Sequence, residues 1–136
     1  DGAAGFSPGP VIGSPSASIL AARFVDLDRS GTFDLVVARD GTNQVYLNAN
    51  GVFAAPTNIT TDNHDSRSLD LADLNRDGYT DIMVGNYNQI NRYYLNAGDG
   101  VSWIGSDIGA ESEATTSLAV FADTTQALLY VGNDGS

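Results

Sequence analysis

Two short stretches of the sequence place oxygen-bearing side chains at every second position and then turn at a glycine. The first is DLDRSGTFD, from Asp26 to Asp34, and the second is DLNRDGYTD, from Asp73 to Asp81. Ca²⁺ takes about six to eight oxygen ligands, and a tight loop can offer them from alternate residues. The spacing therefore predicts a cation site in each loop.

The expected ligands are side-chain oxygens and one backbone carbonyl per loop. In the first loop they are Asp26, Asp28, Ser30, the carbonyl of Thr32, and Asp34, with the turn at Gly31. In the second loop they are Asp73, Asn75, Asp77, the carbonyl of Tyr79, and Asp81, with the turn at Gly78. The clustered carboxylates of each loop would repel one another without a cation. Ca²⁺ suits such a loop better than Mg²⁺, which prefers a smaller octahedral shell and keeps more waters. We expect the second site to be the stronger, because a serine hydroxyl is a weaker ligand than the carboxylate of Asp77.

Two other structures could produce the same spacing of residues. A helix–loop–helix calcium site needs a glutamate at the twelfth position, where this sequence has Val37 and Val84, and it needs helices on both sides. A polar β-turn, in which Asp and Asn bond their own backbone, would be enough to explain one isolated match. Two matches in register favour the metal site.

The two loops belong to an internal repeat. Asp26 and Asp73 are 73 − 26 = 47 positions apart, and Asp34 and Asp81 keep the same interval. Other segments recur at or next to this interval: FSPGPVI as FAAPTNI, VYLNANG as YYLNAGDG, and IMVGNY as LYVGND. The short apolar runs within each unit, such as DLVVA and DIMVG, are bounded by turn residues and predict strands. About four strands in roughly 45 residues is the size of one β-propeller blade.

The phase of the repeat divides the chain into four parts. Residues 1–14 would be the last strand of a preceding blade, residues 15–60 and 61–109 two blades with calcium loops, and residues 110–136 an incomplete, degenerate blade. At the 47-residue interval the third unit offers Val120, Ala122 and Thr124, so its metal site would be lost. Propellers close with about four to eight blades. The expected fold is therefore all-β. The chain would be either a partial propeller, with two full blades and a split third, or one part of a ring that several copies complete. We favour the partial propeller, as a fragment of a longer protein.

Charge and composition limit the partners. The chain has 136 residues, a net charge of −11 and no cysteine. A strongly acidic protein is a poor match for nucleic acid or anionic membranes, which need a positive face. No apolar run is long enough to span a membrane. The first residues lack the features of a signal peptide, although a leader could have been removed.

The order of these motifs resembles the FG-GAP/VCBS repeat family. The resemblance rests on the pattern D-x-[DN]-x-[DS]-G-x-x-D, the apolar strand after it, the YLN strand and the segment FAAP, from Phe53 to Pro56. Members form β-propellers, including the head of integrin α subunits, fungal lectins and secreted bacterial surface proteins. The resemblance implies structural calcium bound by the loop residues named above, an extracellular or cell-surface location, and a role in binding or adhesion to a protein or glycan.

An enzyme and a lectin are the alternatives. His64 lies in a polar connection, where we expect it to face solvent, and Glu111 and Glu113 lie in a polar linker, so nothing in the spacing indicates catalysis. The chain is expected not to be an enzyme, with a propeller of a secreted polysaccharide-degrading protein as the enzymatic alternative.

The lectin alternative depends on aromatic side chains. Tyr46, Tyr94, Trp103 and Phe53 could line a sugar-binding surface. Their recurrence from unit to unit favours packing between neighbouring sheets instead.

Overall fold

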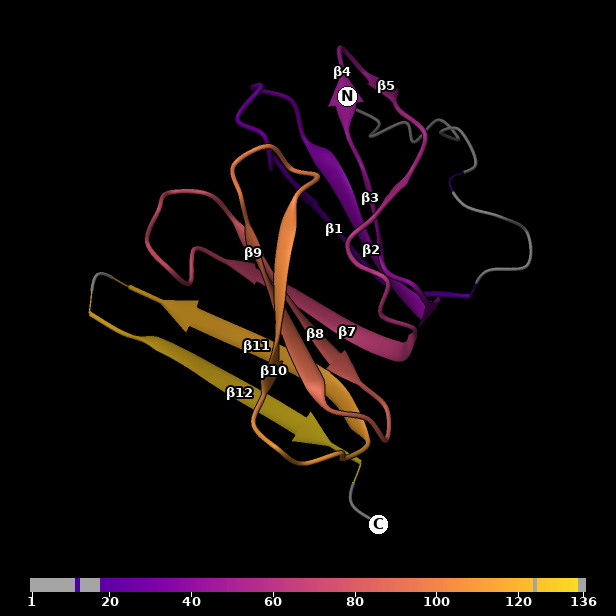
Figure 1. Cartoon of the computed structure of the whole chain (residues 1–136), viewed down its shortest axis with the longest axis vertical. Coiled ribbons are helices and arrows are strands. Elements are labelled where there is room, and N and C mark those ends of the chain that lie inside the picture. Colours follow the sequence, from indigo (N-terminus) through magenta and orange to yellow (C-terminus); the bar gives the residue numbers. More distant parts are fainter. Residues whose placement is uncertain (1–11, 13–17, 124, 135–136) are drawn as a thin grey trace, which may run out of the picture.

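Every element of the described chain is a β-strand, as Figure 1 shows. The computed structural model describes Ile12 and residues 18–123 and 125–134. Among these residues there is no helix, and so none that could cross a membrane. The strands are β1 (Ile19–Val25), β2 (Asp34–Gly41), β3 (Gln44–Tyr46), β4 (Asn48–Ala49), β5 (Val52–Phe53), β6 (Thr57–Asn58), β7 (His64–Ala72), β8 (Asp81–Asn86), β9 (Asn91–Asn96), β10 (Trp103–Ile108), β11 (Thr115–Ala122) and β12 (Ala127–Asn133). The all-β prediction is confirmed.

The second repeat forms a regular antiparallel meander of four strands, β7 to β10. Its run DIMVGN becomes β8, and all six residues are buried because β7 and β9 flank it on both sides. Ile82 pairs with Leu71 of β7 and with Tyr94 of β9. This is the blade that the sequence predicts.

The first repeat is less regular at its outer edge. β1, β2 and β3 pair in order, but the chain then forms a small β4–β5 hairpin before β6 pairs with β3. Phe53 lies in that hairpin, and Pro56, which has no N–H to donate, precedes the short β6. The fourth strand of this unit is therefore only two residues long.

One irregularity recurs in the first strand of every unit. The register shifts between Ile19 and Ala21 in β1, between Ser66 and Ser68 in β7, and between Thr115 and Ser117 in β11. Such a bulge adds one residue and increases the local twist of the strand. The repeat is thus visible in backbone geometry and extends to the β11–β12 hairpin.

The third unit corrects one detail of the sequence alignment. Val120 and Ala122 lie within β11, so these two are not ligand positions of a loop, and Thr124 is outside the described residues. The connection after β11 covers only residues 123–126, whereas residues 73–80 follow β7. Because this hairpin is shorter, the 47-residue interval fails in β11: the register shift at Ser66 and Ser68 recurs at Thr115 and Ser117, which are 49 residues later. The absence of a third metal site stays a prediction.

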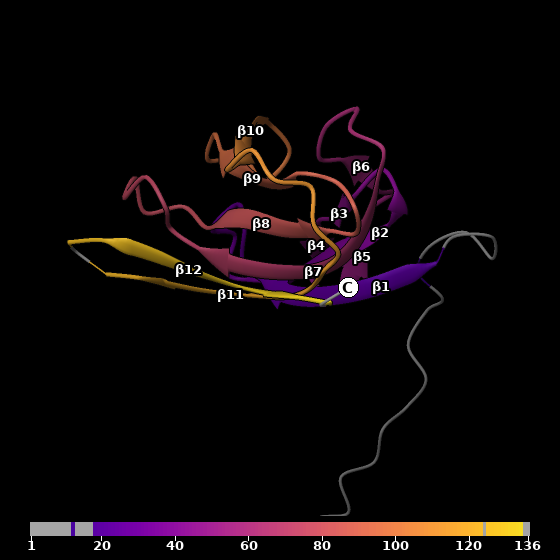
Figure 2. The ribbon, with the colours of Figure 1, turned by 90° about the horizontal axis from the view of Figure 1, so that it is seen from below.

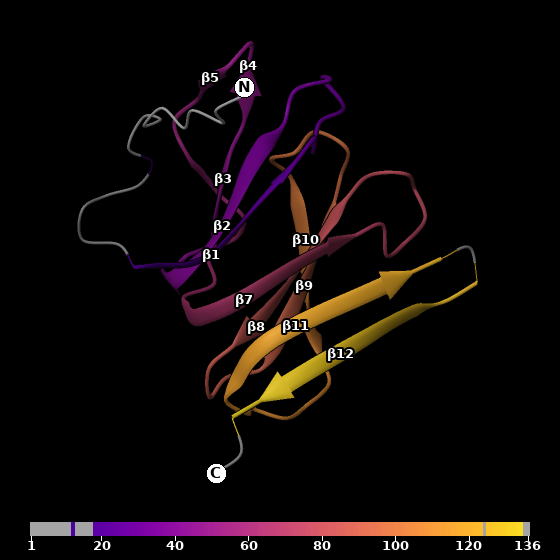
Figure 3. The ribbon, with the colours of Figure 1, turned by 180° about the vertical axis from the view of Figure 1, so that it is seen from behind.

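Neighbouring units meet along their first strands. In Figures 2 and 3, β1, β7 and β11 lie side by side, and Figure 2 shows β8, β9 and β10 stacked away from them. The end of β2 pairs with the start of β7 through Asp40 and Asp65. A single bridge between Tyr87 and Ala114 repeats this link between the second and third units. This arrangement is that of successive propeller blades.

The main hydrophobic core fills the space between the first two units. Its buried members are Leu27, Val36, Ala38, Val45, Ile59, Leu69, Ile82, Val84 and Tyr94. A smaller cluster of Leu35, Val37 and Tyr46 is covered by Ile12 and Phe53. Tyr46 and Tyr94 are at most 3% exposed, so both pack in cores rather than offering a surface to sugars. Ile12 is the only described residue of the predicted strand at 1–14, and the division of the chain at residues 15, 61 and 110 stays a prediction.

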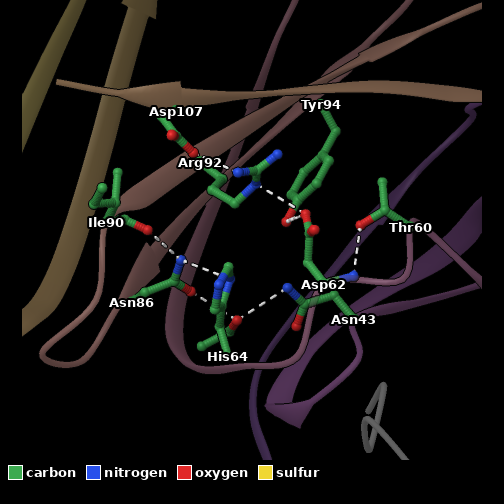
Figure 4. A network of polar contacts seen from close by, with 10 residues as sticks. Asn43, Thr60, Asp62, His64, Asn86, Ile90, Arg92, Tyr94 and Asp107 are labelled. Atoms are coloured by element: carbon green, nitrogen blue, oxygen red, sulfur yellow. Dashed lines mark hydrogen bonds and ion pairs between the residues drawn. The ribbon is translucent and has the colours of Figure 1, made fainter. Parts of the chain in front are cut away.

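A polar relay joins the first unit to the second (Figure 4), and a matching relay joins the second unit to the third. Asn43 Nδ2 donates to Ser66 Oγ at 2.9 Å, and Ser66 Oγ donates to Asn86 Oδ1 at 2.8 Å. The next boundary repeats the arrangement: Asn91 Nδ2 donates to Thr115 Oγ1 at 3.0 Å, and Thr115 Oγ1 donates to Asn133 Oδ1 at 2.9 Å. Ser66, Asn86 and Thr115 are fully buried. Since buried polar groups need partners, these bonds fix how one unit sits on the next.

The same view corrects the placement of His64. It begins β7, is half-buried, and its Nδ1 lies 3.4 Å from Asn86 Nδ2, rather than facing solvent in a connection. Beside it, Tyr94 donates from its hydroxyl to Asp62 Oδ2 at 3.1 Å, and Arg92 Nε pairs with the same oxygen at 2.8 Å. Burial, with the neighbouring Asp62 charge, raises the pKa of Tyr94 to about 12.

Candidate metal centre

The first loop gathers three carboxylates between β1 and β2. Oxygens of Asp26, Asp28 and Asp34 lie within 4.8 Å of one another, and within the described part of the chain this is the one such group of acidic or histidine side chains. Asp26 immediately follows β1, and Asp34 opens β2. The hairpin therefore brings together residues that the spacing alone predicted as neighbours.

The last aspartate of each loop is its buried anchor. Asp34 accepts N–H groups from Leu27 and Asn48, both at 2.8 Å, one on each carboxylate oxygen. Asp81 does the same with Leu74 at 2.7 Å and Asn96 at 2.9 Å. Both side chains are fully buried. Each anchor thus joins the start of its loop, the second strand and the end of the YLN segment.

Burial dominates the electrostatics of these anchors. It raises the pKa of Asp34 and of Asp81 above the ordinary aspartate value, although the backbone hydrogen bonds act in the opposite direction. The neighbouring carboxylates Asp28 and Asp26 add to the increase at Asp34, and Asp77 adds to it at Asp81. A divalent cation placed among these carboxylates would offset their mutual repulsion.

The first aspartate of each loop has one bonded oxygen and one without a partner. Asp26 Oδ2 accepts the N–H of Gly31 at 2.9 Å, and Asp73 Oδ2 accepts that of Gly78 at 2.8 Å. The other oxygen, Oδ1, is buried in both loops and accepts no hydrogen bond from the residues that the structure describes. A buried carboxylate oxygen without a partner is costly. The same vacant acceptor in both loops, among hard oxygen donors, fits a calcium ion.

The backbone path of the two loops is also the same. Arg29 and Arg76 have φ of 58° and 63°, and Gly31 and Gly78 have φ of 87° and 88°. The left-handed region costs a non-glycine residue roughly 1–2 kcal/mol. That two arginines accept this conformation at equivalent positions indicates that the loop bonds, rather than local preference, impose the path.

The loops differ at their middle ligands. In the first, Ser30 Oγ and Thr32 Oγ1 lie 2.9 Å apart, and Thr32 Oγ1 donates to the carbonyl of Asn48 at 2.6 Å. In the second, Asp77 accepts Tyr79 N–H at 2.8 Å and Asn75 Nδ2 at 2.8 Å, and these bonds lower its pKa. Three carboxylates converge in the first loop. In the second loop, Asp77 instead bonds Asn75 and Tyr79 of the same loop. The expectation that the second site is the stronger stays a prediction.

Sequence reasoning missed the asparagine of each YLN segment. Asn48 donates its backbone N–H to Asp34 and its side-chain amide to the carbonyl of Phe33 at 2.9 Å. Asn96 repeats this with Asp81 and with the carbonyl of Thr80 at 3.3 Å. These two residues hold the acidic loops against the sheet. The recurrence of YLN beside each loop was the signal that could have identified them.

The residues considered for catalysis or glycan binding do not converge on a second centre. Glu111 and Glu113 are exposed in the connection before β11. Trp103 and Phe53 are half-buried and pack against the two hydrophobic cores.

Comparison with known proteins agrees with this geometry. Residues 26–84 match the FG-GAP-like repeat, and residues 67–104 match the FG-GAP repeat. Cartilage acidic protein 1 of Homo sapiens is 34% identical over 94 residues, which is 69% of this chain and 13% of that protein. The chain thus corresponds to a small part of that relative. On the matched repeats, the strand order and the paired acidic loops, the chain belongs to the FG-GAP repeat family.

Proposed function

We propose that the chain is a calcium-binding β-propeller module in which calcium is structural and which serves binding or adhesion outside the cell. The observation that carries the metal is the buried, unpartnered Oδ1 of Asp26 and of Asp73, at equivalent places in two matching loops. One such oxygen could be a local defect. Two, each with a buried anchor opposite, indicate a site that the fold builds twice.

The first and last aspartates of each loop have different roles. Asp34 and Asp81 hold the loop to the strands through their backbone bonds, while Asp26 and Asp73 cap the turn at its glycine. Bound Ca²⁺ would supply the positive charge that neutralises the clustered carboxylates. The hairpins would then be fixed relative to the sheet, because loop, strand and YLN segment share the same carboxylate.

The expected ligand set of the loops and the relative described above support an extracellular role. Loops with two or three carboxylates and neutral oxygens suit the weaker range of calcium binding, which millimolar extracellular calcium fills. The relative whose name places it in cartilage is consistent with this location. With a net charge of −11, the module suits a partner with a basic surface or one held through calcium.

Non-enzymatic binding remains the better proposal than a lectin or a hydrolase. The repeated tyrosines, Tyr46 and Tyr94, are buried, so the aromatic ladder that would favour sugar binding is not built from them. Glu111 and Glu113 are exposed rather than placed in an apolar environment that would tune a general acid.

Thermal unfolding in chelator and in millimolar calcium tests the metal. We expect calcium to raise the midpoint by on the order of 10 °C, since a ligand at about a hundred times its Kd adds about 2.7 kcal/mol. Magnesium should raise it much less. The pair Asp26→Asn and Asp73→Asn should abolish the rise, and an exposed control, Asp40→Asn, should keep it. A wild-type midpoint that is the same in chelator and in calcium contradicts the proposal.

A further inference from the structure

We propose that the two calcium loops are coupled, and that Arg29 is the positioning residue through which an ion in the first loop strengthens binding in the second. This inference rests on the calcium function proposed above and adds to it a direction and a residue. Nothing in the spacing of the two motifs requires it, because each loop has a complete ligand set of its own.

Arg29 extends from the first loop onto the second. Its guanidinium Nη2 donates to the carbonyl of Gly78, which is 49 residues later in the chain. The same guanidinium lies over the ring of Tyr79, with its Cζ 4.3 Å from the ring centroid. A hydrogen bond and a cation–π contact thus act on adjacent residues of the second loop.

At its own end, Arg29 stands between two expected ligands. Asp28 precedes it and Ser30 follows it, and its φ of 58° is left-handed. Ser30 N–H donates to Asp28 Oδ1 at 3.0 Å, closing the turn around the arginine. An ion held by Asp28 and Ser30 would stabilise this costly conformation, and the conformation sets the direction of the guanidinium.

At the far end, the guanidinium acts on the turn that presents the backbone ligand. Gly78 has φ of 88°, and a Cβ added there would meet the Arg29 guanidinium. Tyr79, whose carbonyl is an expected ligand, has its ring enclosed between Arg29 and Gly98, where a Cβ would lie 2.9 Å from that ring. Arg29 therefore limits the freedom of the two residues that must be ordered before the second loop can close on an ion.

A second contact keeps the two loops at a fixed separation. Asn96, whose N–H holds the anchor of the second loop, donates its side-chain amide to the carbonyl of Leu27 in the first loop at 2.9 Å. Both residues are buried. This contact holds the two loops at a fixed separation. A change in the conformation of Arg29 in the first loop therefore alters its contacts with the second loop, rather than moving both loops together.

The positive charge of Arg29 by itself opposes calcium binding in the second loop. A guanidinium beside the second loop repels a divalent cation there, by roughly 1 kcal/mol or less through water. The coupling must therefore come from ordering, and Arg29→Lys separates the two effects. Lysine keeps the charge but loses the planar group that stacks on Tyr79 and reaches the Gly78 carbonyl.

A thermodynamic cycle on the full chain, read by calorimetric titration with CaCl₂, tests the proposal. Asp28→Ala disables the first site, and we expect it to weaken the second site about five- to tenfold in an otherwise wild-type chain. In Arg29→Ala and in Arg29→Lys the same change should alter the second site less than about twofold. Arg76→Ala is the matched control, since Arg76 occupies the equivalent left-handed position in the second loop, and there the full effect should persist.

The outcomes separate the two proposals. Calcium binding at both loops with an Asp28→Ala effect that survives Arg29→Lys overturns the coupling role of Arg29 and leaves the calcium function intact. Independent sites in the wild-type chain overturn the coupling as well. Absence of any calcium-dependent heat or midpoint shift overturns the calcium function itself. Circular dichroism of each variant in chelator shows whether it is folded, and Arg29, being exposed, is not needed for the core.

Discussion

The side-chain amide of Asn96 donates a hydrogen bond to the backbone carbonyl of Leu27, 69 residues earlier, at 2.9 Å. The acceptor lies inside the first acidic loop, and the donor closes the third strand of the next repeat. Leu27 is fully buried in the core between the two units. The acidic loop of one blade is therefore held in place by the following blade.

Replacing Asn96 by aspartate should destabilise the fold strongly. The carboxylate keeps the shape of the amide but faces the carbonyls of Leu27 and Thr80, which would lose their donor and meet a buried negative charge. We expect a loss of about 3 kcal/mol or more in the free energy of unfolding by urea. Asn48→Asp is the matched control: Asn48 is less buried and donates only within its own unit, so the loss should be about 1 kcal/mol. Equal losses would argue against the inter-blade bond.

Neutralising an anchor carboxylate should destabilise the protein even in chelator. Asp81→Asn replaces one of two buried acceptor oxygens by an NH₂ group, so either Leu74 or Asn96 loses the partner of its N–H. We expect a loss of about 2–4 kcal/mol, and the same for Asp34→Asn. The exposed Asp40→Asn should change the free energy of unfolding by less than about 0.5 kcal/mol. If the anchor variants matched this control in chelator, their role would be metal binding alone.

The polar relay should depend on its central hydroxyl. Ser66→Ala leaves Asn43 Nδ2 without its acceptor and Asn86 Oδ1 without its donor, both buried, and we expect a loss of about 2–3 kcal/mol. Ser68, on the same strand, offers an internal control. Its Oγ is buried and has no hydrogen-bond partner among the described residues, so Ser68→Ala should be neutral or slightly stabilising. Chemical denaturation of both variants side by side would reverse this interpretation if Ser68→Ala were the more damaging.

The calcium-free protein should gain stability as the pH falls from neutral towards about 4. The folded-state pKa values of Asp34 and Asp81 are raised above the ordinary aspartate value of 3.8, so the folded state binds protons before the unfolded state does. The penalty from these two charges is present above their folded pKa and removed below it. Asp77, Asp99 and Asp123 have lowered pKa values, so the stability they add is lost only below 3.8.

Urea unfolding in chelator at a series of pH values measures this dependence. Asp34→Asn should flatten the rise relative to wild type, which separates the anchor from the general relief of negative charge. In calcium the trend should reverse, because protons compete with the ion for the carboxylates. A wild-type free energy of unfolding that falls steadily from pH 7 to about 4 in chelator would be inconsistent with raised anchor pKa values.

The local features of this protein could be predicted from the sequence. The 47-residue interval, the alternating oxygens of the loops and the brief apolar runs of β2 and β8 indicated an all-β repeat protein with two acidic hairpins. These features follow from nearest-neighbour chemistry: glycine allows the left-handed turn, and alternation sets which side chains share a face. The glycine turn and the alternation of side chains are enough to bring Asp26, Asp28 and Asp34 together.

Only the tertiary structure decided how the repeats are joined. The shortened turn at residues 123–126 displaced the third set of positions, because hairpin length sets strand register independently of the average repeat. His64 became part of a half-buried network, and Asn96 came to hold the first loop through Leu27, 69 residues away. Arg29 reaches Gly78 for the same reason. Contacts between units depend on the angle at which one twisted sheet packs on the next, and that angle is a property of the whole core rather than of any motif.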